Sequence, residues 1–259
     1  MSLHQLFLEE QVLAQETDAV FPLRLTPEDA KHVRVLRLAP GEHIAVVDGA
    51  GDYFECQVED TADGLTVRIC RREDVPARPQ VLLVQGLAKG DKMDAVIRQG
   101  TELGVAAFMP LACERSVVKL DGAKEEKRAR RWQAIAKSAA MQSGQPAIPE
   151  ISPLRTVEEA CALLAEATAV AICWEEAPLD VRMGDAIRKG REACGAAHPS
   201  DVRLAVVVGP EGGLASSEVD QLLTCNPRAS VVSLGSSILR TETAGVVAAA
   251  LALYELGCL

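Results

Sequence analysis

Two stretches near the carboxyl end decide the fold: GPEGG at residues 209–213 and SLGSSILRTETAGVVAAALALYE at residues 233–255. The apolar run from Leu204 to Val208 precedes the first stretch, and Val231 and Val232 precede the second. Each arrangement predicts a buried strand that ends in a glycine loop and is followed by a helix. The apolar run from Ala244 to Leu253 predicts that the second helix is buried. Two such units in succession predict a ligand crevice at the carboxyl ends of strands in an α/β sheet.

The glycine loops constrain what such a crevice would bind. Glycines let backbone N–H and C=O groups approach a ligand closely, and such groups can read an adenine edge without a charged side chain. The chain has no GxxxxGK[ST] motif, and no GxGxxG follows a predicted strand, so a triphosphate site is not supported. The residues alone leave two interpretations open: a pocket for a nucleoside-like ligand, or a tight strand-to-helix turn.

Composition sets the class of protein. The chain has 259 residues, of which 48% are hydrophobic and 25% charged, which is typical of a soluble globular protein with one large or two small domains. Aromatic residues are only 3%, so the core must be aliphatic, and stacking on an aromatic platform is not expected to dominate RNA binding. No apolar run reaches the roughly 20 residues of a membrane helix, and no signal peptide is expected. Eight scattered cysteines without a CxxC pair predict reduced thiols in a cytoplasmic protein and no metal site.

The net charge of −10 argues against broad, non-specific nucleic-acid binding, although basic residues can still gather on one face. Three basic clusters are present. The first cluster is Arg24, Lys31, Arg34 and Arg37, and it suits either a solvated surface or phosphate contacts. The second is Arg68, Arg71 and Arg72. The third, at residues 124–131, mixes glutamates with basic residues and is interpreted as a solvated helix surface.

The chain divides into two patterns. Residues 1–72 read mostly as short strands with one helix that begins after Thr26 and Pro27, and they predict a small β domain. Residues 73–80 contain two prolines and form the predicted linker. Residues 81–259 alternate strands with helices, which predicts a largely parallel sheet. The expected strands are 81–87, 105–109 and 169–174, and the expected helices are 92–103, 125–143, 157–164 and 180–192.

GPEGGL at 209–214, followed by LGSSILRTETA at 234–244, resembles the signature of the ribosomal RNA small subunit methyltransferase E family, in the SPOUT class of knotted methyltransferases. The resemblance extends in order over nearly the whole chain. It includes KHVRVLRLAPGE at 31–42, KGDKMDAVIRQGTELGV at 89–105, ERSVVK at 114–119 and RW at 131–132. It implies an α/β fold: a trefoil-knotted, mostly parallel sheet with helices on both faces at 81–259, after a PUA-like β-barrel at 1–72. It also implies a homodimer.

The resemblance implies methyl transfer from S-adenosylmethionine to N3 of a uridine in 16S ribosomal RNA of the small subunit, without a metal. Arg240 and Glu242 are the expected catalytic residues: Arg240 to stabilise or orient the uracil, and Glu242 to act as base or to hold Arg240. A structural salt bridge at a helix N-terminus is the alternative for this pair. Thr241 and Thr243 are also expected to cap that helix, as a serine at 216 or 217 would cap the preceding one.

The expected cofactor contacts are mainly backbone and apolar groups of the two glycine loops. They are Trp174, Gly209, Glu211, Gly212, Gly213, Leu234, Gly235, Ile238, Leu239 and Thr243. Trp174 suits a buried core position equally well. The expected RNA contacts are Arg24, Arg34, Arg37, Lys89, Arg115 and Gln142.

Three positions depart from the family pattern. Ser237 stands where relatives usually have arginine before Ile238, Met141 where they have glutamate, and Gln145 where they have arginine. These departures leave the cofactor loops intact but affect the expected substrate face. Two alternatives therefore remain: a SPOUT methyltransferase with a different RNA target, and a non-catalytic RNA-binding or ribosome assembly protein.

Overall fold

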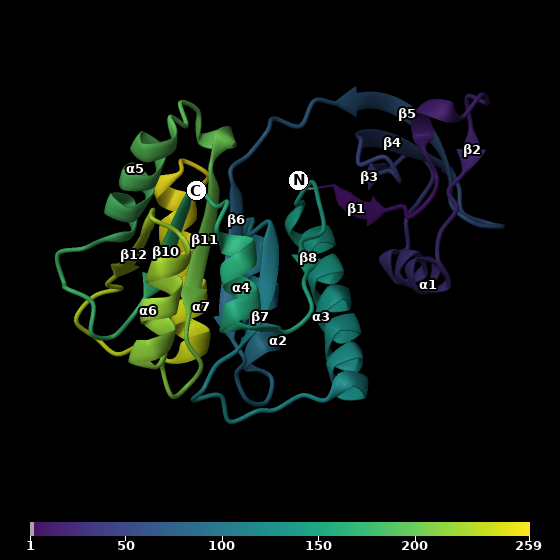
Figure 1. Cartoon of the computed structure of the whole chain (residues 1–259). Helices are drawn as coiled ribbons and strands as arrows, with labels where there is room; N and C mark the ends of the chain where they lie inside the picture. Colours follow the sequence, from purple (N-terminus) through teal and green to yellow (C-terminus); the bar gives the residue numbers. More distant parts are fainter. Residues whose placement is uncertain (1–2) are drawn as a thin grey trace. The chain divides into compact units, whose positions relative to one another are not determined.

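The computed structural model describes residues 3–259, which form two compact units (Figure 1). The first unit comprises the chain up to Pro76 together with Ala140–Ala147, and the second comprises Ala77–Ala139 and Ile148–Leu259. The chain thus passes from the first unit to the second within the segment predicted as a linker. The return of 140–147 to the first unit was not predicted; there the Gln5 side-chain amide donates to the Gln145 carbonyl over 2.6 Å.

The first unit contains a five-stranded mixed sheet in the order β1-β3-β4-β5-β2. Strands β1 and β3 are parallel, and the other neighbours are antiparallel. The helix α1 begins as predicted, because the hydroxyl of Thr26 accepts a hydrogen bond from the N–H of Asp29. The elements are β1 (His4–Phe7), the 3-10 turn η1 (Leu13–Gln15), β2 (Phe21–Pro22), α1 (Pro27–Leu36), β3 (His43–Val47), β4 (Tyr53–Asp60) and β5 (Thr66–Glu73).

The second unit is built on a seven-stranded sheet in which every pair of neighbours is parallel. Its order is β12-β10-β11-β6-β7-β8, with β9 also paired to β7. The prediction of a largely parallel sheet is therefore confirmed. The strands are β6 (Gln80–Gly86), β7 (Ala107–Ala112), β8 (Glu150–Ile151), β9 (Arg155–Thr156), β10 (Ala169–Cys173), β11 (Arg203–Val208) and β12 (Ala229–Val232).

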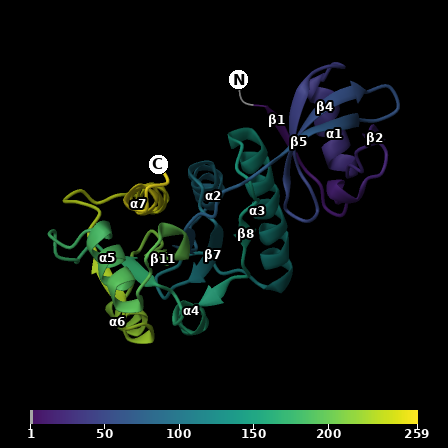
Figure 2. The ribbon, with the colours of Figure 1, turned by 90° about the horizontal axis from the view of Figure 1, so that it is seen from above.

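Both faces of this sheet are covered by helices. Alternate residues of β11 separate between two hydrophobic clusters: Leu204 and Val206 lie in one cluster, and Ala205 and Val207 in the other. The first cluster includes side chains of α2 (Lys92–Leu103), α3 (Gly122–Ser143), α5 (Met183–Cys194) and α7 (Thr241–Glu255). The second includes α4 (Val157–Leu164) and α6 (Ser216–Cys225). Figure 2 shows α2 and α7 on one side of the sheet and α4 and α6 on the other.

The apolar helix α7 is only half buried, so the prediction of a buried helix needs correction. Gly245, Ala248 and Ala252 pack inward, whereas Tyr254 is 67% and Leu251 38% exposed. An all-apolar sequence has no hydrophobic periodicity to indicate which face is covered. Within residues 3–259, no helix is long and apolar enough to cross a membrane. The trefoil knot that the resemblance implies stays a prediction.

The predicted caps of the last two helices also need correction. Helix α6 begins after Ala215, whose N–H donates to the carboxylate of Glu218 over 2.8 Å, so no serine caps it. Helix α7 begins after Arg240 without a side-chain cap. The Thr241 hydroxyl bonds the Gly209 carbonyl and the Gln85 side-chain amide instead.

Candidate active site

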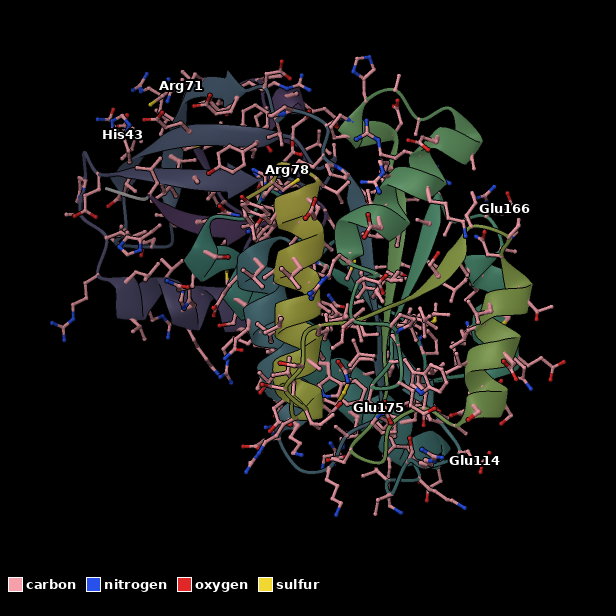
Figure 3. The ribbon with its side chains drawn as sticks, turned by 90° about the vertical axis from the view of Figure 1, so that its left-hand side faces the viewer. His43, Arg71, Arg78, Glu114, Glu166 and Glu175 are labelled. Carbon is pink, nitrogen blue, oxygen red and sulfur yellow. The ribbon has the colours of Figure 1, made fainter. Side chains whose placement is uncertain are left out.

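A cavity of about 750 Å³ lies where β10, β11 and β12 end. Three loops line it: the segment after β10, the GPEGG loop after β11, and the segment from Ser233 to Arg240 after β12. Figure 3 shows Glu175, just after β10, and Glu114, just after β7, at one end of the second unit, whereas Glu166, which precedes β10, lies away from them. The predicted crevice at the carboxyl ends of the strands is therefore present.

Most of the residues expected to bind a cofactor are brought together here. Those that line the cavity are Trp174, Gly209, Glu211, Gly212, Gly213, Leu234, Gly235, Ile238 and Leu239. Thr243 does not line it; its side chain is exposed on α7. Trp174 is partly exposed, and the fully buried core tryptophan is Trp132 instead.

Glycine is required in the GPEGG loop for steric reasons. Gly213 has φ +71°, in the left-handed region, and a Cβ there would collide with the Glu175 carboxylate. A Cβ on Gly209 would lie 2.9 Å from the carbonyl carbon of Gly213. The loop therefore folds back closely on itself and presents backbone rather than side chains to the cavity.

Two buried side chains join the GPEGG loop to the start of α7. The Thr241 hydroxyl donates to the Gly209 carbonyl over 2.6 Å and accepts from the Gln85 amide over 2.9 Å. Gln85, at the end of β6, is 1% exposed, and Thr241 is 5% exposed. Sequence reasoning assigned Thr241 only a capping role and did not single out Gln85, because their partners are more than 30 residues away in the chain.

The outer side of the same loop is held by the segment after β7. The Arg115 guanidinium donates to the carbonyls of Gly212 and Leu214, each over 3.3 Å. The buried Glu218 carboxylate accepts from the N–H of Glu114 over 2.8 Å. Arg115, expected to contact RNA, thus already supports the GPEGG loop.

A lysine that was not predicted as a site residue, Lys92, pairs with two carboxylates at this site. The Lys92 ammonium lies 3.0 Å from Glu211 Oε1 and 3.3 Å from Glu242 Oε2. Hydrogen bonding to Glu211 raises the pKa of Lys92 against a smaller opposing effect of burial, and Glu242 adds to the rise. Burial would raise the pKa of Glu211, but the Lys89 N–H and the Lys92 ammonium hold it below its usual value. The only signal in the sequence was the position of Lys92 within KGDKMDAVIRQ.

The two expected catalytic residues occupy different places. Arg240 lines the cavity, is exposed, and has no carboxylate within ion-pair distance among residues 3–259. Glu242 does not line the cavity; its carboxylate pairs with Lys92 rather than with Arg240. The alternative of an Arg240–Glu242 salt bridge is therefore not what the structure contains.

The remaining residues expected to contact RNA lie in both units. In the first unit, Arg24 pairs with Glu16, whereas Arg34 and Arg37 line a hollow of about 430 Å³ and have no ion-pair partner within the described chain. Gln142 is exposed near the end of α3. In the second unit, Lys89 contributes its backbone N–H to Glu211 over 3.0 Å.

Family comparisons agree with this architecture. The RNA methyltransferase domain family matches residues 76–253, and the RNA methyltransferase PUA domain family matches residues 25–70. Ribosomal RNA small subunit methyltransferase E of Mycobacterium bovis is 36% identical, over 83% of this chain and 79% of its own. The chain belongs to the ribosomal RNA small subunit methyltransferase E family. The Bacillus subtilis member of the family is 30% identical over 95% of this chain and 94% of its own.

Solved structures support the same family and confirm the α/β fold with its PUA-like β domain. The family member from Neisseria gonorrhoeae, bound to S-adenosyl methionine, superimposes with a TM-score of 0.78 at 28% identity and covers 97% of both chains. A putative methyltransferase of Legionella pneumophila, also with bound cofactor, gives a TM-score of 0.73 at 25% identity over 98% of both chains.

Proposed function

We propose that the chain transfers a methyl group from S-adenosylmethionine to N3 of a uridine in 16S ribosomal RNA of the small subunit. The observation that carries the proposal is the cavity at the ends of β10, β11 and β12, with backbone of two glycine loops on its walls and Arg240 at its edge. The name of the relatives and the cofactor in the Neisseria gonorrhoeae structure support it.

The residues of the cavity fit this cofactor. Backbone N–H and C=O groups of the loops suit the edge of an adenine, and Leu234, Leu239 and Trp174 supply apolar walls. The carboxylates of Glu175 and Glu211 face the same cavity and suit ribose hydroxyls and a positive charge. When bound, the cofactor supplies an electrophilic methyl group on a sulfonium.

The protein must then prepare the nucleophile. Uracil N3 bears a proton at neutral pH, and the base gains negative charge on its oxygens as that proton leaves. Arg240, free of a carboxylate partner, is suited to stabilise this charge. Glu242 is the candidate for the proton acceptor, because its carboxylate pairs with Lys92, which lines the cavity. The N3 proton leaves as the N–CH3 bond forms and the S–CH3 bond breaks.

Binding of RNA would use both units. We assign Arg34 and Arg37 to phosphate contacts because they lack carboxylate partners, whereas Arg68, Arg71 and Arg72 are all paired with carboxylates of their own unit. The half-exposed apolar face of α7 is our candidate for a homodimer interface, in which both copies would build each site. The enzyme would act in the cytoplasm, where its substrate is assembled.

The test is methyl transfer from labelled S-adenosylmethionine to unmethylated small ribosomal subunits, mapped by reverse-transcription stops. A methyl group on N3 blocks the pairing edge, so one strong stop in 16S RNA is expected. Arg240→Ala should lower kcat by roughly 10²- to 10³-fold while leaving cofactor affinity within about threefold. An Arg240→Ala enzyme with full turnover would contradict the assignment of Arg240.

The alternatives predict other results. Methyl transfer to another RNA, or at another atom, would indicate a SPOUT enzyme with a changed target, which the substitutions at Met141, Gln145 and Ser237 would then explain. No cofactor binding at all would indicate a non-catalytic RNA-binding or assembly protein.

A further inference from the structure

Lys92 occupies a position that local helix energetics disfavour. It is the first residue of α2, where the partial positive charge of the helix N-terminus repels an ammonium group. The preceding residue, Asp91, makes no side-chain capping bond that would offset this repulsion. A residue that breaks a local rule is explained by its tertiary partners, and often by function.

The partners of Lys92 come from the two segments that form the candidate site. Glu211 lies in the GPEGG loop after β11, and Glu242 lies in the first turn of α7. The ammonium bridges them, at 3.0 Å and 3.3 Å, and the three side chains are only 22–27% exposed. The Glu211 carboxylate is further fixed by the Lys89 N–H at 3.0 Å.

The bridge links Glu242 to the cavity through Lys92. Lys92 and Glu211 line the cavity and Glu242 does not. The buried Oε2 of Glu242 receives no hydrogen bond of good geometry within residues 3–259, so the ammonium at 3.3 Å is the group that neutralises it. Without this ammonium, a carboxylate would be left unpaired in a partly buried place, close to a second carboxylate.

We propose that Lys92 is a positioning residue: its ammonium ties Glu211 of the GPEGG loop to Glu242 at the start of α7, and so fixes the loop proposed to hold the cofactor relative to the proposed proton acceptor. This inference rests on the proposed function and adds to it a residue that joins the two halves of the site. Lys92 acts through the two glutamates. Because pairing with both carboxylates raises its pKa, the amine remains an ammonium at neutral pH and does not take the uracil proton.

The two glutamates predict two separate effects of replacing Lys92. Lys92→Met should raise the dissociation constant of S-adenosylmethionine by about 3- to 10-fold, because Glu211 loses its tether, and lower kcat by about 10- to 100-fold, because Glu242 is no longer held. Lys92→Arg keeps the positive charge and can pair with both carboxylates, and should restore kcat to within about fivefold of the wild type. Lys124→Met is the matched control, since it removes an exposed lysine–carboxylate pair (2.9 Å to Asp121) in the first turn of α3, outside the cavity.

The experiment combines calorimetry of S-adenosylmethionine binding with steady-state methyl transfer to small subunits, for the single variants and for Lys92→Met combined with Glu242→Gln. In the Glu242→Gln background, Lys92→Met should lower kcat by less than about threefold, because its route through Glu242 is already removed. The same factor in both backgrounds would overturn the proposal. So would an effect confined to the KM for subunits, which would make Lys92 a plain RNA contact.

Wild-type data separate this inference from the proposed function. If wild-type protein binds S-adenosylmethionine but does not methylate small subunits, the proposed substrate is wrong, and the calorimetric comparison still decides the role of Lys92. Unchanged cofactor affinity in Lys92→Met would then overturn the inference. Tryptophan fluorescence melts of each variant identify any that fails to fold, in which case Lys92→Gln, which retains a donor without charge, replaces Lys92→Met.

Discussion

Replacing Thr241 by valine should loosen the join between the two loops of the site. Valine keeps the shape of threonine, but it loses the hydroxyl that donates to Gly209 and accepts from Gln85. Both partners are buried, and Gln85 Oε1 already has no partner within the described chain. Thr241→Val therefore leaves a carbonyl and an amide N–H with only long contacts, of 3.4–3.5 Å, to replace the lost bonds.

The magnitude follows from these two groups. Each buried group that loses its partner costs about 1–3 kcal/mol, and the long remaining contacts offset a part, so the total loss is about 2–4 kcal/mol of the free energy of unfolding. For a domain of this size, each kcal/mol lowers the melting temperature by about 2–4 °C. We expect a decrease of about 4–16 °C.

The assay is a thermal melt followed by intrinsic tryptophan fluorescence. Both tryptophans, Trp132 and Trp174, lie in the second unit, so the signal reports the unit that carries the site. Thr243→Val is the matched control for stability, because the Thr243 hydroxyl is exposed and its loss should cost less than about 0.5 kcal/mol. Equal melting temperatures of the two variants would refute the argument that Thr241 joins the loops.

Three further changes test other parts of the molecule. Gly86→Ala places a Cβ 2.6 Å from the backbone carbonyl carbon of Gly209 and should displace the GPEGG loop. Calorimetry should then show a loss of cofactor affinity of at least about tenfold. Gly122→Ala, with open space around the added Cβ, is the control, and equal cofactor affinities of the two variants would count against the steric argument. The pKa of Glu211 is depressed in the folded protein, so its stabilising effect is complete above the ordinary glutamate value of about 4.3 and is lost as pH falls through the lower folded value. Lys92→Met removes one cause of this depression, so the variant should lose less free energy of unfolding than the wild type between about pH 6 and pH 3, measured by urea melts with tryptophan fluorescence; an equal loss in both proteins would contradict the pairing. Tyr254→Asp, on the exposed face of α7, should convert a dimer to a folded monomer in sedimentation velocity, and an unchanged mass would exclude that face as the interface.

Much of the second unit could be predicted from the sequence because its signals are local. Helices 92–103 and 157–164 end where the pattern predicts, at a left-handed glycine (Gly104) in the first case. Five strands are short apolar runs between glycine and polar turns, so they were predicted with ends that shift by at most three residues, whereas the two-residue strands β8 and β9 were not predicted. The contribution of 140–147 to the first unit had no such local signal, since it depends on a contact such as Gln5–Gln145, 140 residues apart.

The candidate site was predicted in its backbone and less completely in its side chains. The two glycine loops were found because glycine and apolar residues at fixed spacing specify a turn whatever surrounds it. The partners of Lys92, Arg115 and Thr241 could not be found this way. Each contacts a residue 30 or more positions away in the chain. Which charged side chains meet depends on the order of the strands in the sheet, and hydrophobic periodicity carries no information about that order.

By itself, then, the sequence determined an α/β chain with a small β domain before it, and two glycine loops at strand ends that match one family of RNA methyltransferases. Local backbone preferences and hydrophobic periodicity carry that information, and they need no knowledge of distant contacts. Only the tertiary structure decided that Glu242 faces Lys92 rather than Arg240, that Arg115 supports the GPEGG loop, and that one face of α7 stays exposed. These depend on placing β11 between β6 and β10, which brings α2 together with the GPEGG loop and α7, both of which lie more than 100 residues later in the chain.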